Sequence, residues 1–226
     1  MFAKFVEKRF LGPGREMKAS QFALLPAVEG ETVFLGDSIT AGGQWQEWFP
    51  GVPLRNRGID GDKTTNVLAR LDVALRADPS RVFLLIGTND ISFGHKDDEI
   101  TDNVRTIVQR TQITTPHTEV YVQSIMPRRA KQAPRIRKLN AEYKRIAEDQ
   151  GVTFIDLWPA LSAGDELRPG YTLDSLHLTG AGYRAWAEVL EPLLSVQRPL
   201  SDRALEGAIR GRANFGERRT DRSMSG

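Results

Sequence analysis

The chain has 226 residues, of which 40% are hydrophobic and 27% charged, and it carries a formal net charge of +2 without any cysteine. The length fits one globular domain with a full core, and the composition excludes a chain that is disordered throughout. The lack of cysteine excludes disulfides, thiolate zinc sites and cysteine nucleophiles.

Residues 1–30 give no clear structural pattern, and we interpret them as an N-terminal arm. Residues 1–11 mix charged with apolar side chains, so they lack the continuous apolar stretch of a signal peptide. No apolar run approaches the roughly 20 residues that a membrane-spanning helix needs. We therefore expect a cytoplasmic protein without a membrane span.

From residue 31 to residue 198, short β-type runs alternate with longer helical patterns, which is typical of a parallel sheet covered by helices. Residues 82–86 and 152–155 are largely apolar on both faces, as expected of strands buried between two helix layers. The five predicted strands are Thr32–Gly36, Leu54–Arg57, Arg81–Gly87, Glu119–Ser124 and Val152–Leu157.

Between these runs, apolar residues recur at three- and four-residue spacing, which predicts amphipathic helices. A last helix is expected from Gly180 to Leu190 or beyond, with Pro192 marking a kink or its end. The fold class is therefore α/β, a three-layer α/β/α sandwich with a five-stranded parallel sheet. The recurring residues are Val67, Leu68, Leu71 and Leu75, then Ile100, Val104, Ile107 and Val108, then Ile136, Leu139, Tyr143 and Ile146.

Residues 199–226 form an arginine-rich segment that we expect to be disordered, because it has few large apolar side chains. This segment accounts for the net positive charge of the chain. A role for it in binding a polyanion or a protein is an alternative to a solvated tail. We expect no nucleic-acid partner, and the oligomeric state is not readable from the sequence.

Ser38 follows the first predicted strand within Gly36-Asp37-Ser38-Ile39-Thr40. A serine at a strand-to-helix turn exposes its hydroxyl, and its own N–H at the helix start can bind developing negative charge. The alternative is that Asp37 or Ser38 only caps the helix. Thr40 breaks the Gly-x-Ser-x-Gly pattern, which speaks against the usual α/β-hydrolase elbow.

Two further polar turns follow predicted strands. Gly58 comes directly after the second strand, where a glycine lets a backbone N–H approach a ligand, although a simple turn glycine is the alternative. Asn89 comes after the third strand and can present an amide donor, as an oxyanion site requires, although a turn or helix cap is the alternative.

His177 lies just before the last helix and has an aspartate, Asp174, three residues ahead. At that offset the carboxylate can hold the imidazole Nδ1–H and leave Nε2 free to accept a proton from a serine. His95 and His117 lack such a partner and are expected at the surface. The histidines have no paired-ligand spacing, so the sequence predicts no metal and no cofactor.

Ligands bind outside the carboxyl ends of the strands in sheets of this type, and all of these residues follow strand ends. By the same rule we expect four residues to border the substrate pocket. They are Trp45, Phe93, Met126 and Pro127.

The order Ser, Gly, Asn, Asp-x-x-His resembles the SGNH (GDSL-type) hydrolase family, from Thr32 through Trp186. It is most similar to the platelet-activating-factor acetylhydrolase-like esterases. The matching blocks are Val-Phe-Leu-Gly-Asp-Ser-Ile-Thr, Asn-Arg-Gly-Ile, Ile-Gly-Thr-Asn-Asp and Asp-x-Leu-His-Leu, with Ser175 as a departure because glycine is usual there. The resemblance implies a flavodoxin-like SGNH hydrolase fold, and Ser38 as nucleophile with His177 as base and Asp174 as its orienting acid. It also implies an oxyanion hole made by the Ser38 and Gly58 N–H groups and the Asn89 amide.

The expected function is a serine esterase that cleaves carboxylic esters through an acyl-enzyme. Its substrate is a small-molecule ester with a short acyl chain, or an O-acetyl group on a carbohydrate or lipid. The alternatives are a lysophospholipase or thioesterase of the same fold and a non-catalytic flavodoxin-like module that binds a phosphate or nucleotide.

Overall fold

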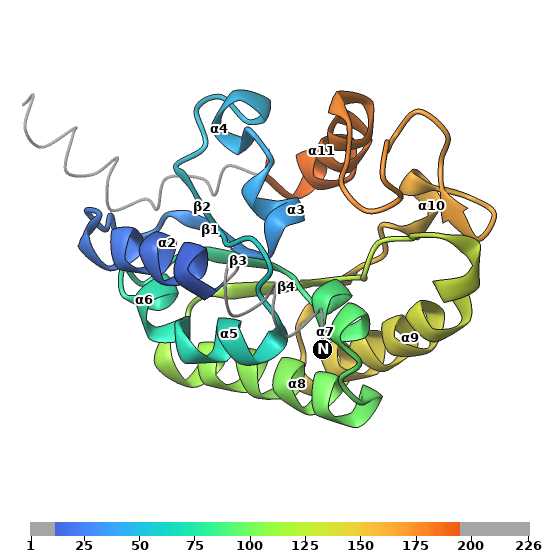
Figure 1. Ribbon diagram of the computed structural model, residues 1–226. Helices are drawn as coiled ribbons and strands as arrows, with labels where there is room; N and C mark the ends of the chain where they lie inside the picture. The colour runs from blue at the N-terminus through green and yellow to red at the C-terminus, as the bar shows by residue number, and fades with distance from the viewer. Residues whose placement is uncertain (1–11, 195–226) are drawn as a thin grey trace, which may run out of the picture. The chain divides into compact units, whose positions relative to one another are not determined.

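Five parallel strands form the central sheet in the order β2-β1-β3-β4-β5 (Figure 1). The structure is a computed structural model that describes residues 12–194, so the arginine-rich segment expected to be disordered lies outside the described residues. All five predicted strands are present, although β3, β4 and β5 are shorter than predicted and β2 is one residue longer. The strands are β1 (Thr32–Gly36), β2 (Leu54–Gly58), β3 (Arg81–Leu85), β4 (Glu119–Gln123) and β5 (Thr153–Ile155).

Helices connect the strands and cover both faces of the sheet, which confirms the predicted three-layer α/β/α class (Figure 1). The last helix continues through Pro192, so the proline does not end it. The helices are α2 (Gly12–Leu24), α3 (Ser38–Ala41), α4 (Trp45–Trp48), α5 (Thr64–Ala69), α6 (Leu71–Leu75), α7 (Thr88–Phe93), α8 (Asp97–Thr114), η2 (Ala130–Gln132), α9 (Ala133–Gln150), α10 (Trp158–Leu161) and α11 (Gly180–Leu194). A small hairpin, β6 (Ser162–Ala163) and β7 (Glu166–Leu167), follows α10.

The two faces of the sheet have different chemistry because successive side chains of a strand point to opposite sides. On one face Val33 and Leu35 of β1 pack with aliphatic side chains of α5, α6, α8 and α9. The apolar residues predicted for α8 and α9 are buried in this layer, including Val104 and Ile136. The periodic pattern of these helices therefore identifies their buried faces correctly.

The opposite face is aromatic. Phe34 and Phe83 are paired in the β1–β3 register, and their rings stack with centroids 5.0 Å apart. Phe83 stacks in turn on Tyr121 of β4, and Trp45 stacks on Phe34 at 4.6 Å. Trp186 of α11 meets the Trp45 ring edge-on at 4.5 Å. This row of rings fixes α4 and α11 against the sheet, and such contacts stabilise beyond their buried area.

The strand order places a topological switch point at β1, which has β2 on one side and β3 on the other. Chain connections leave β1 and β3 in opposite directions at such a point, and a crevice forms outside the strand ends. Ser38 follows β1 and Asn89 follows β3. The fold therefore brings the Ser38 turn to the position where ligands bind in sheets of this kind.

Helix α2 lies within the segment that the sequence analysis treats as an arm. Its Phe22 is buried, and the guanidinium of Arg57 on β2 lies 4.8 Å from the Phe22 ring centroid. Side chains of α2 also line the pocket described below. Among the described residues, none of the helices has the length and apolar character needed to cross a membrane.

The close packing of α3 on β2 depends on Gly58, and we predict that Gly58→Ala destabilises the fold. An added Cβ would lie 2.2 Å from the Ala41 nitrogen and 2.8 Å from the Asp37 carbonyl oxygen, so backbone has to move. We expect a loss of about 3 kcal/mol or more in the free energy of unfolding, and a melting temperature lower by roughly 6 °C or more. Thermal unfolding followed by circular dichroism measures this.

Gly180→Ala is the matched control, because nothing lies within 4 Å of a Cβ at Gly180. Its melting temperature should stay close to that of the parent. Equal melting temperatures for Gly58→Ala and Gly180→Ala would contradict the packing argument.

Candidate active site

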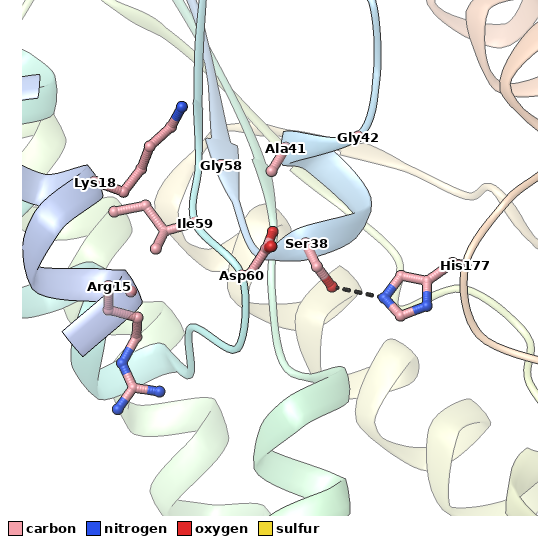
Figure 2. Close-up of a pocket in the computed structure, with 10 residues that line it drawn as sticks. Arg15, Lys18, Ser38, Ala41, Gly42, Gly58, Ile59, Asp60 and His177 are labelled. Carbon is pink, nitrogen blue, oxygen red and sulfur yellow. Dashed lines mark hydrogen bonds between the residues drawn. The ribbon is translucent and has the colours of Figure 1, made fainter. Parts of the chain in front are cut away.

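Ser38 is the first residue of α3 and follows a sharp turn between β1 and α3. This turn requires a glycine at the end of β1, Gly36. A Cβ on Gly36 would lie 2.3 Å from Thr40 Oγ1. Asp37 caps the helix, since its Oδ1 accepts a hydrogen bond from the Ile39 N–H at 3.0 Å. The capping alternative considered for this motif therefore applies to Asp37, while the Ser38 side chain is half-buried and points out of the turn (Figure 2).

The carbonyl end of α3 is held by side chains from other elements. The Asn56 amide of β2 lies 3.0 Å from the Thr40 carbonyl oxygen and 3.1 Å from that of Ala41. The Tyr183 hydroxyl of α11 donates to the Ile39 carbonyl at 2.8 Å. Because the last carbonyls of a short helix otherwise lack partners, these bonds fix the orientation of α3 and of Ser38 with it.

Asp174 and His177 lie on a loop that the aspartate itself organises. Asp174 Oδ1 accepts from the N–H groups of Leu176 at 2.9 Å and His177 at 2.8 Å, which closes a tight turn. Ser175 has φ +65°, a left-handed conformation that favours glycine. This left-handed conformation explains why glycine is usual at this position in the family that the motif blocks resemble. In this chain serine adopts the same left-handed conformation.

Ser38, His177 and Asp174 form a continuous hydrogen-bonded chain. Ser38 Oγ lies 3.0 Å from His177 Nε2, and His177 Nδ1 lies 2.7 Å from Asp174 Oδ2 (Figure 2 draws the first contact). Partial burial of Asp174 acts to raise its pKa, but the hydrogen bonds from His177 and Leu176 outweigh this and hold the pKa well below its usual range. The carboxylate is therefore ionised at neutral pH and can orient an imidazole that takes a proton from the hydroxyl.

The donors expected for an oxyanion differ in their present partners. The Ser38 N–H has no acceptor within the part of the chain that the structure describes. The Gly58 N–H donates to Asn56 Oδ1 at 2.9 Å, so a bound oxyanion would have to compete for it. Asn89 donates one amide hydrogen to the Asp62 carbonyl at 2.9 Å, and a second amide hydrogen remains for another acceptor.

Gly61 is a donor that the sequence analysis missed. It sits in a turn closed by the Asp62 N–H and the Ile59 carbonyl at 3.1 Å, and its φ is +75°. Across residues 12–194 its own N–H finds no acceptor. The Gly-Asp pair before a helix carries a turn signal, but the sequence does not show which glycine of the segment has a free N–H.

A pocket of about 590 Å³ opens beside Ser38 and His177. Figure 2 shows Ser38 at the centre, His177 on one side and α2 on the other. Arg15 and Lys18 of α2 contribute cationic side chains to the wall, and Asp60 contributes a carboxylate. The pocket wall therefore combines charged side chains with about as much apolar surface, and α2 belongs to it although the sequence pattern points to none of its residues.

Three of the four residues expected at the pocket are buried instead, so those predictions are wrong. Trp45 is fully buried, and its Nε1 donates to the Thr40 carbonyl at 2.8 Å. Met126 and Pro127 are buried as well. Phe93 is half-buried at the end of α7, with Lys63 Nζ 5.2 Å from its ring centroid, and it does not line the pocket beside Ser38.

Within residues 12–194, no group of three or more His, Cys, Asp or Glu side chains could hold a metal ion. His117 is exposed as expected, whereas His95 is half-buried and its Nδ1 lies 2.9 Å from Glu99 Oε1. Both lie outside the Ser38 pocket.

Asp37 is a buried acid that directly precedes Ser38. Burial raises its pKa to about 7, although the hydrogen bond from Ile39 acts in the opposite direction, and the negative charges of Asp62 and Asp90 raise it further. The native state therefore binds a proton here that the unfolded chain, with an aspartate pKa of about 3.9, releases at lower pH.

We predict that Asp37 makes the protein less stable as the pH rises from about 4 to about 7, because the folded pKa is above the unfolded one. Asp37→Asn keeps an oxygen for the Ile39 N–H and removes the titration. Between pH 5 and pH 8 the free energy of unfolding of the parent should fall relative to that of Asp37→Asn by about 2–3 kcal/mol. Urea titrations at both pH values measure it, and a constant difference would show that Asp37 does not titrate in this range.

Comparisons with known proteins agree with this geometry. Residues 34–185 match the model of the GDSL-like Lipase/Acylhydrolase family. The chain is 30% identical to the human platelet-activating factor acetylhydrolase IB subunit alpha1 over 178 residues, which is 74% of this chain and 76% of that protein. The human alpha2 subunit is 29% identical over 185 residues, covering 73% and 75% of the two chains.

Solved structures give the same result. A Streptococcus pneumoniae protein assigned as a platelet activating factor superposes with a TM-score of 0.79 and 30% identity, over 85% of this chain and 98% of that one. A GDSL-like lipase from Bacteroides thetaiotaomicron has a TM-score of 0.71 and 23% identity, over 80% and 97%, and this likeness concerns the fold. The chain therefore belongs to the GDSL-like lipase/acylhydrolase family, as its motif blocks imply.

Proposed function

We propose that this protein is a serine esterase that uses Ser38 as nucleophile, His177 as base and Asp174 as the acid that orients it. The observation that carries the proposal is the hydrogen-bonded chain from Ser38 Oγ through the imidazole to the carboxylate, which ends at an open pocket. Membership in an acylhydrolase family supports the hydrolysis of esters.

The reaction runs in two halves. His177 Nε2 takes the Ser38 proton while Oγ attacks the ester carbonyl carbon, and the imidazolium then gives that proton to the leaving alcohol. The ester C–O bond breaks and an acyl-enzyme remains on Ser38. A water molecule then attacks the acyl carbon while His177 takes its proton. The imidazolium gives this proton to Ser38 Oγ as the acyl–Oγ bond breaks, and the acid and the free serine are released.

The oxyanion that forms in each half needs donors at the carboxyl ends of the strands. The expected set is the N–H groups of Ser38 and Gly58 and the amide of Asn89. Because the Gly58 N–H already has Asn56 Oδ1 as acceptor, we propose Gly61 as the better second backbone donor. The unpaired N–H of Ser38 supports its place in the set.

The substrate class proposed is an ester with a short acyl group, including O-acetyl groups on carbohydrate or lipid. The charged side chains of Arg15, Lys18 and Asp60 in the pocket wall suit a small acyl group on a polar alcohol better than a long chain. The name of the human relative, an acetylhydrolase, points to acetyl esters as the first substrates to test. Lysophospholipids and thioesters are the alternatives within this mechanism, and the cytoplasmic location stays a prediction.

We predict that Ser38→Ala and His177→Ala each abolish the hydrolysis of p-nitrophenyl acetate, butyrate and octanoate down to the uncatalysed rate. Asp174→Asn should lower kcat by roughly 10²–10⁴-fold, since the carboxylate that fixes the imidazole is lost while its shape is kept. Release of p-nitrophenolate measures all four proteins, and acetate should be preferred over octanoate.

His117→Ala is the matched control, because His117 is exposed and outside the pocket, and its activity should equal that of the parent. Turnover that survives Ser38→Ala would exclude the serine mechanism. A parent protein without turnover on these esters or on acetylated sugars would favour the non-catalytic module, whose ligand binding should not depend on Ser38.

We predict that Asn89→Ala lowers kcat by about 10²–10³-fold and changes KM by less than about threefold, because an oxyanion donor acts mainly in the transition state. Steady-state kinetics on p-nitrophenyl acetate measures this. Gln112→Ala removes an amide that donates to the Gln150 carbonyl at 2.9 Å, near the C-terminal end of α8 and away from the pocket, and serves as control. A kcat unchanged by Asn89→Ala would remove Asn89 from the proposed oxyanion hole.

A further inference from the structure

Arg70 is a largely buried cation behind the pocket that neither the motif analysis nor the proposed mechanism uses. It lies at the junction of α5 and α6, and 10% of its side chain is exposed. It does not line the pocket beside Ser38. Burial of a guanidinium costs free energy unless its N–H groups find acceptors. The positions of these acceptors therefore show which segments Arg70 connects.

The guanidinium donates to three acceptors on three segments. Nε lies 2.7 Å from Asp62 Oδ2, and one terminal nitrogen lies 3.0 Å from the Gly36 carbonyl oxygen and 2.8 Å from that of Arg57. Gly36 ends β1, Arg57 is the penultimate residue of β2, and Asp62 belongs to the loop after β2. One planar group therefore ties the ends of two adjacent strands to the loop that follows them.

Two of these acceptors lie close in sequence to the N–H groups of Ser38 and Gly58. Gly36 is two residues before Ser38, and Arg57 directly precedes Gly58. Gly36 and Gly58 are also partners in the β1–β2 register. Hydrogen bonds from one guanidinium to both carbonyls restrict the separation of the two strand ends, and with it the direction of the Ser38 N–H.

The third acceptor, Asp62, is also hydrogen-bonded to Asn89. The side chain of Asp62 is 1% exposed and pairs with Arg70, while its carbonyl oxygen accepts the Asn89 amide at 2.9 Å. The Asp62 N–H closes the turn that contains Gly61. The ion pair thus fixes both the carbonyl that orients the Asn89 amide and the turn that presents the Gly61 N–H.

We propose that Arg70 is a positioning residue that sets the geometry of the oxyanion donors, mainly the Asn89 amide through Asp62. The inference rests on the proposed function. Its physical basis is the planar fork of a guanidinium, which satisfies a carboxylate and two carbonyls in a fixed relation. A lysine keeps the charge opposite Asp62 but offers a single flexible ammonium, so it does not hold all three segments.

The test is the variant Arg70→Lys, whose steady-state kinetics are measured on p-nitrophenyl acetate. The number of active sites is determined separately, from the extent of labelling by a fluorophosphonate at completion. We expect kcat per labelled site to fall about 10- to 100-fold with KM changed by less than about threefold, because small misplacements of catalytic donors have effects of this size. A merely structural role would lower the melting temperature or the number of labelled sites and leave kcat per site unchanged.

Arg110→Lys is the matched control. Arg110 bonds the Asp72 carboxylate at 2.6 Å and the Leu68 carbonyl at 3.2 Å, so it contacts the same two helices without reaching the strand ends. Its kcat should equal that of the parent. Arg70→Met is made as well, because a neutral side chain of similar length should lower kcat at least as much as lysine does.

A double-mutant cycle tests the path through Asp62. In an Asn89→Ala background, Arg70→Lys should cost less than about threefold in kcat, because the donor that it positions is absent. The same cost in both backgrounds, or a kcat per site for Arg70→Lys within twofold of the parent, would overturn the inference and leave the serine mechanism intact. A parent protein that the fluorophosphonate does not label would overturn the proposed function itself, and this inference with it.

Discussion

The close approach of α3 to the ends of β1 and β2 is the constraint on which the rest of the site depends. Gly36 and Gly58 leave no side chain between the helix and the strands, and a Cβ at either position would overlap neighbouring atoms. The helix start therefore lies directly at the strand ends, with Ser38 at its first position. Backbone groups brought this close cannot reach water, so their hydrogen bonds must come from side chains such as Asn56.

The same closeness explains why so many charged groups lie under the site. Asp37, Asp62 and Asp90 are each about 1% exposed or less. Asp62 is paired with Arg70, and Asp90 accepts from the N–H and hydroxyl of Thr64 at 3.1 Å and 2.6 Å. Buried ion pairs add little net stability compared with apolar packing. We therefore interpret this network as one that specifies the geometry of the strand ends.

The sequence predicts the sheet well because its signals are local. The continuous apolar runs of β1 and β3 and the periodic residues of α8 and α9 depend on burial by neighbouring layers, which the pattern records directly. The Ser, Gly, Asn and Asp-x-x-His segments also fall at the strand ends, because in a parallel sheet all carboxyl ends meet at one edge.

The pocket residues were predicted poorly, and the reason is physical. A position after a strand end indicates the edge of the sheet but not the direction of a side chain. Trp45 turns into the aromatic layer between Phe34 and Trp186, where burial of its large ring outweighs exposure at the pocket. Arg15 and Lys18 reach the pocket from α2, far away in sequence, and no local pattern announces such a contact.

Ser38 and the pair of His177 and Asp174 are held by different means, and this makes the connection between them important. Ser38 is fixed by the packed interior, whereas the side chains of His177 and Asp174 are 48% and 53% exposed on a loop. The loop is closed at its base by the Thr179 N–H, which donates to the Tyr171 carbonyl at 2.9 Å.

From that base, the Tyr183 N–H donates to the Thr179 carbonyl at 3.0 Å, and the Tyr183 hydroxyl donates to the Ile39 carbonyl inside α3. One side chain thus connects the start of α11, which directly follows the loop of His177, with the helix that begins at Ser38. Burial raises the pKa of Tyr183 to about 12, and the negative charges of Asp37 and Asp60 act in the same direction, so the hydroxyl keeps its proton at neutral pH. The 3.0 Å contact between Ser38 and His177 thus joins two segments that this neutral hydroxyl also connects, and the bond from Tyr183 to Ile39 does not change with pH near neutrality.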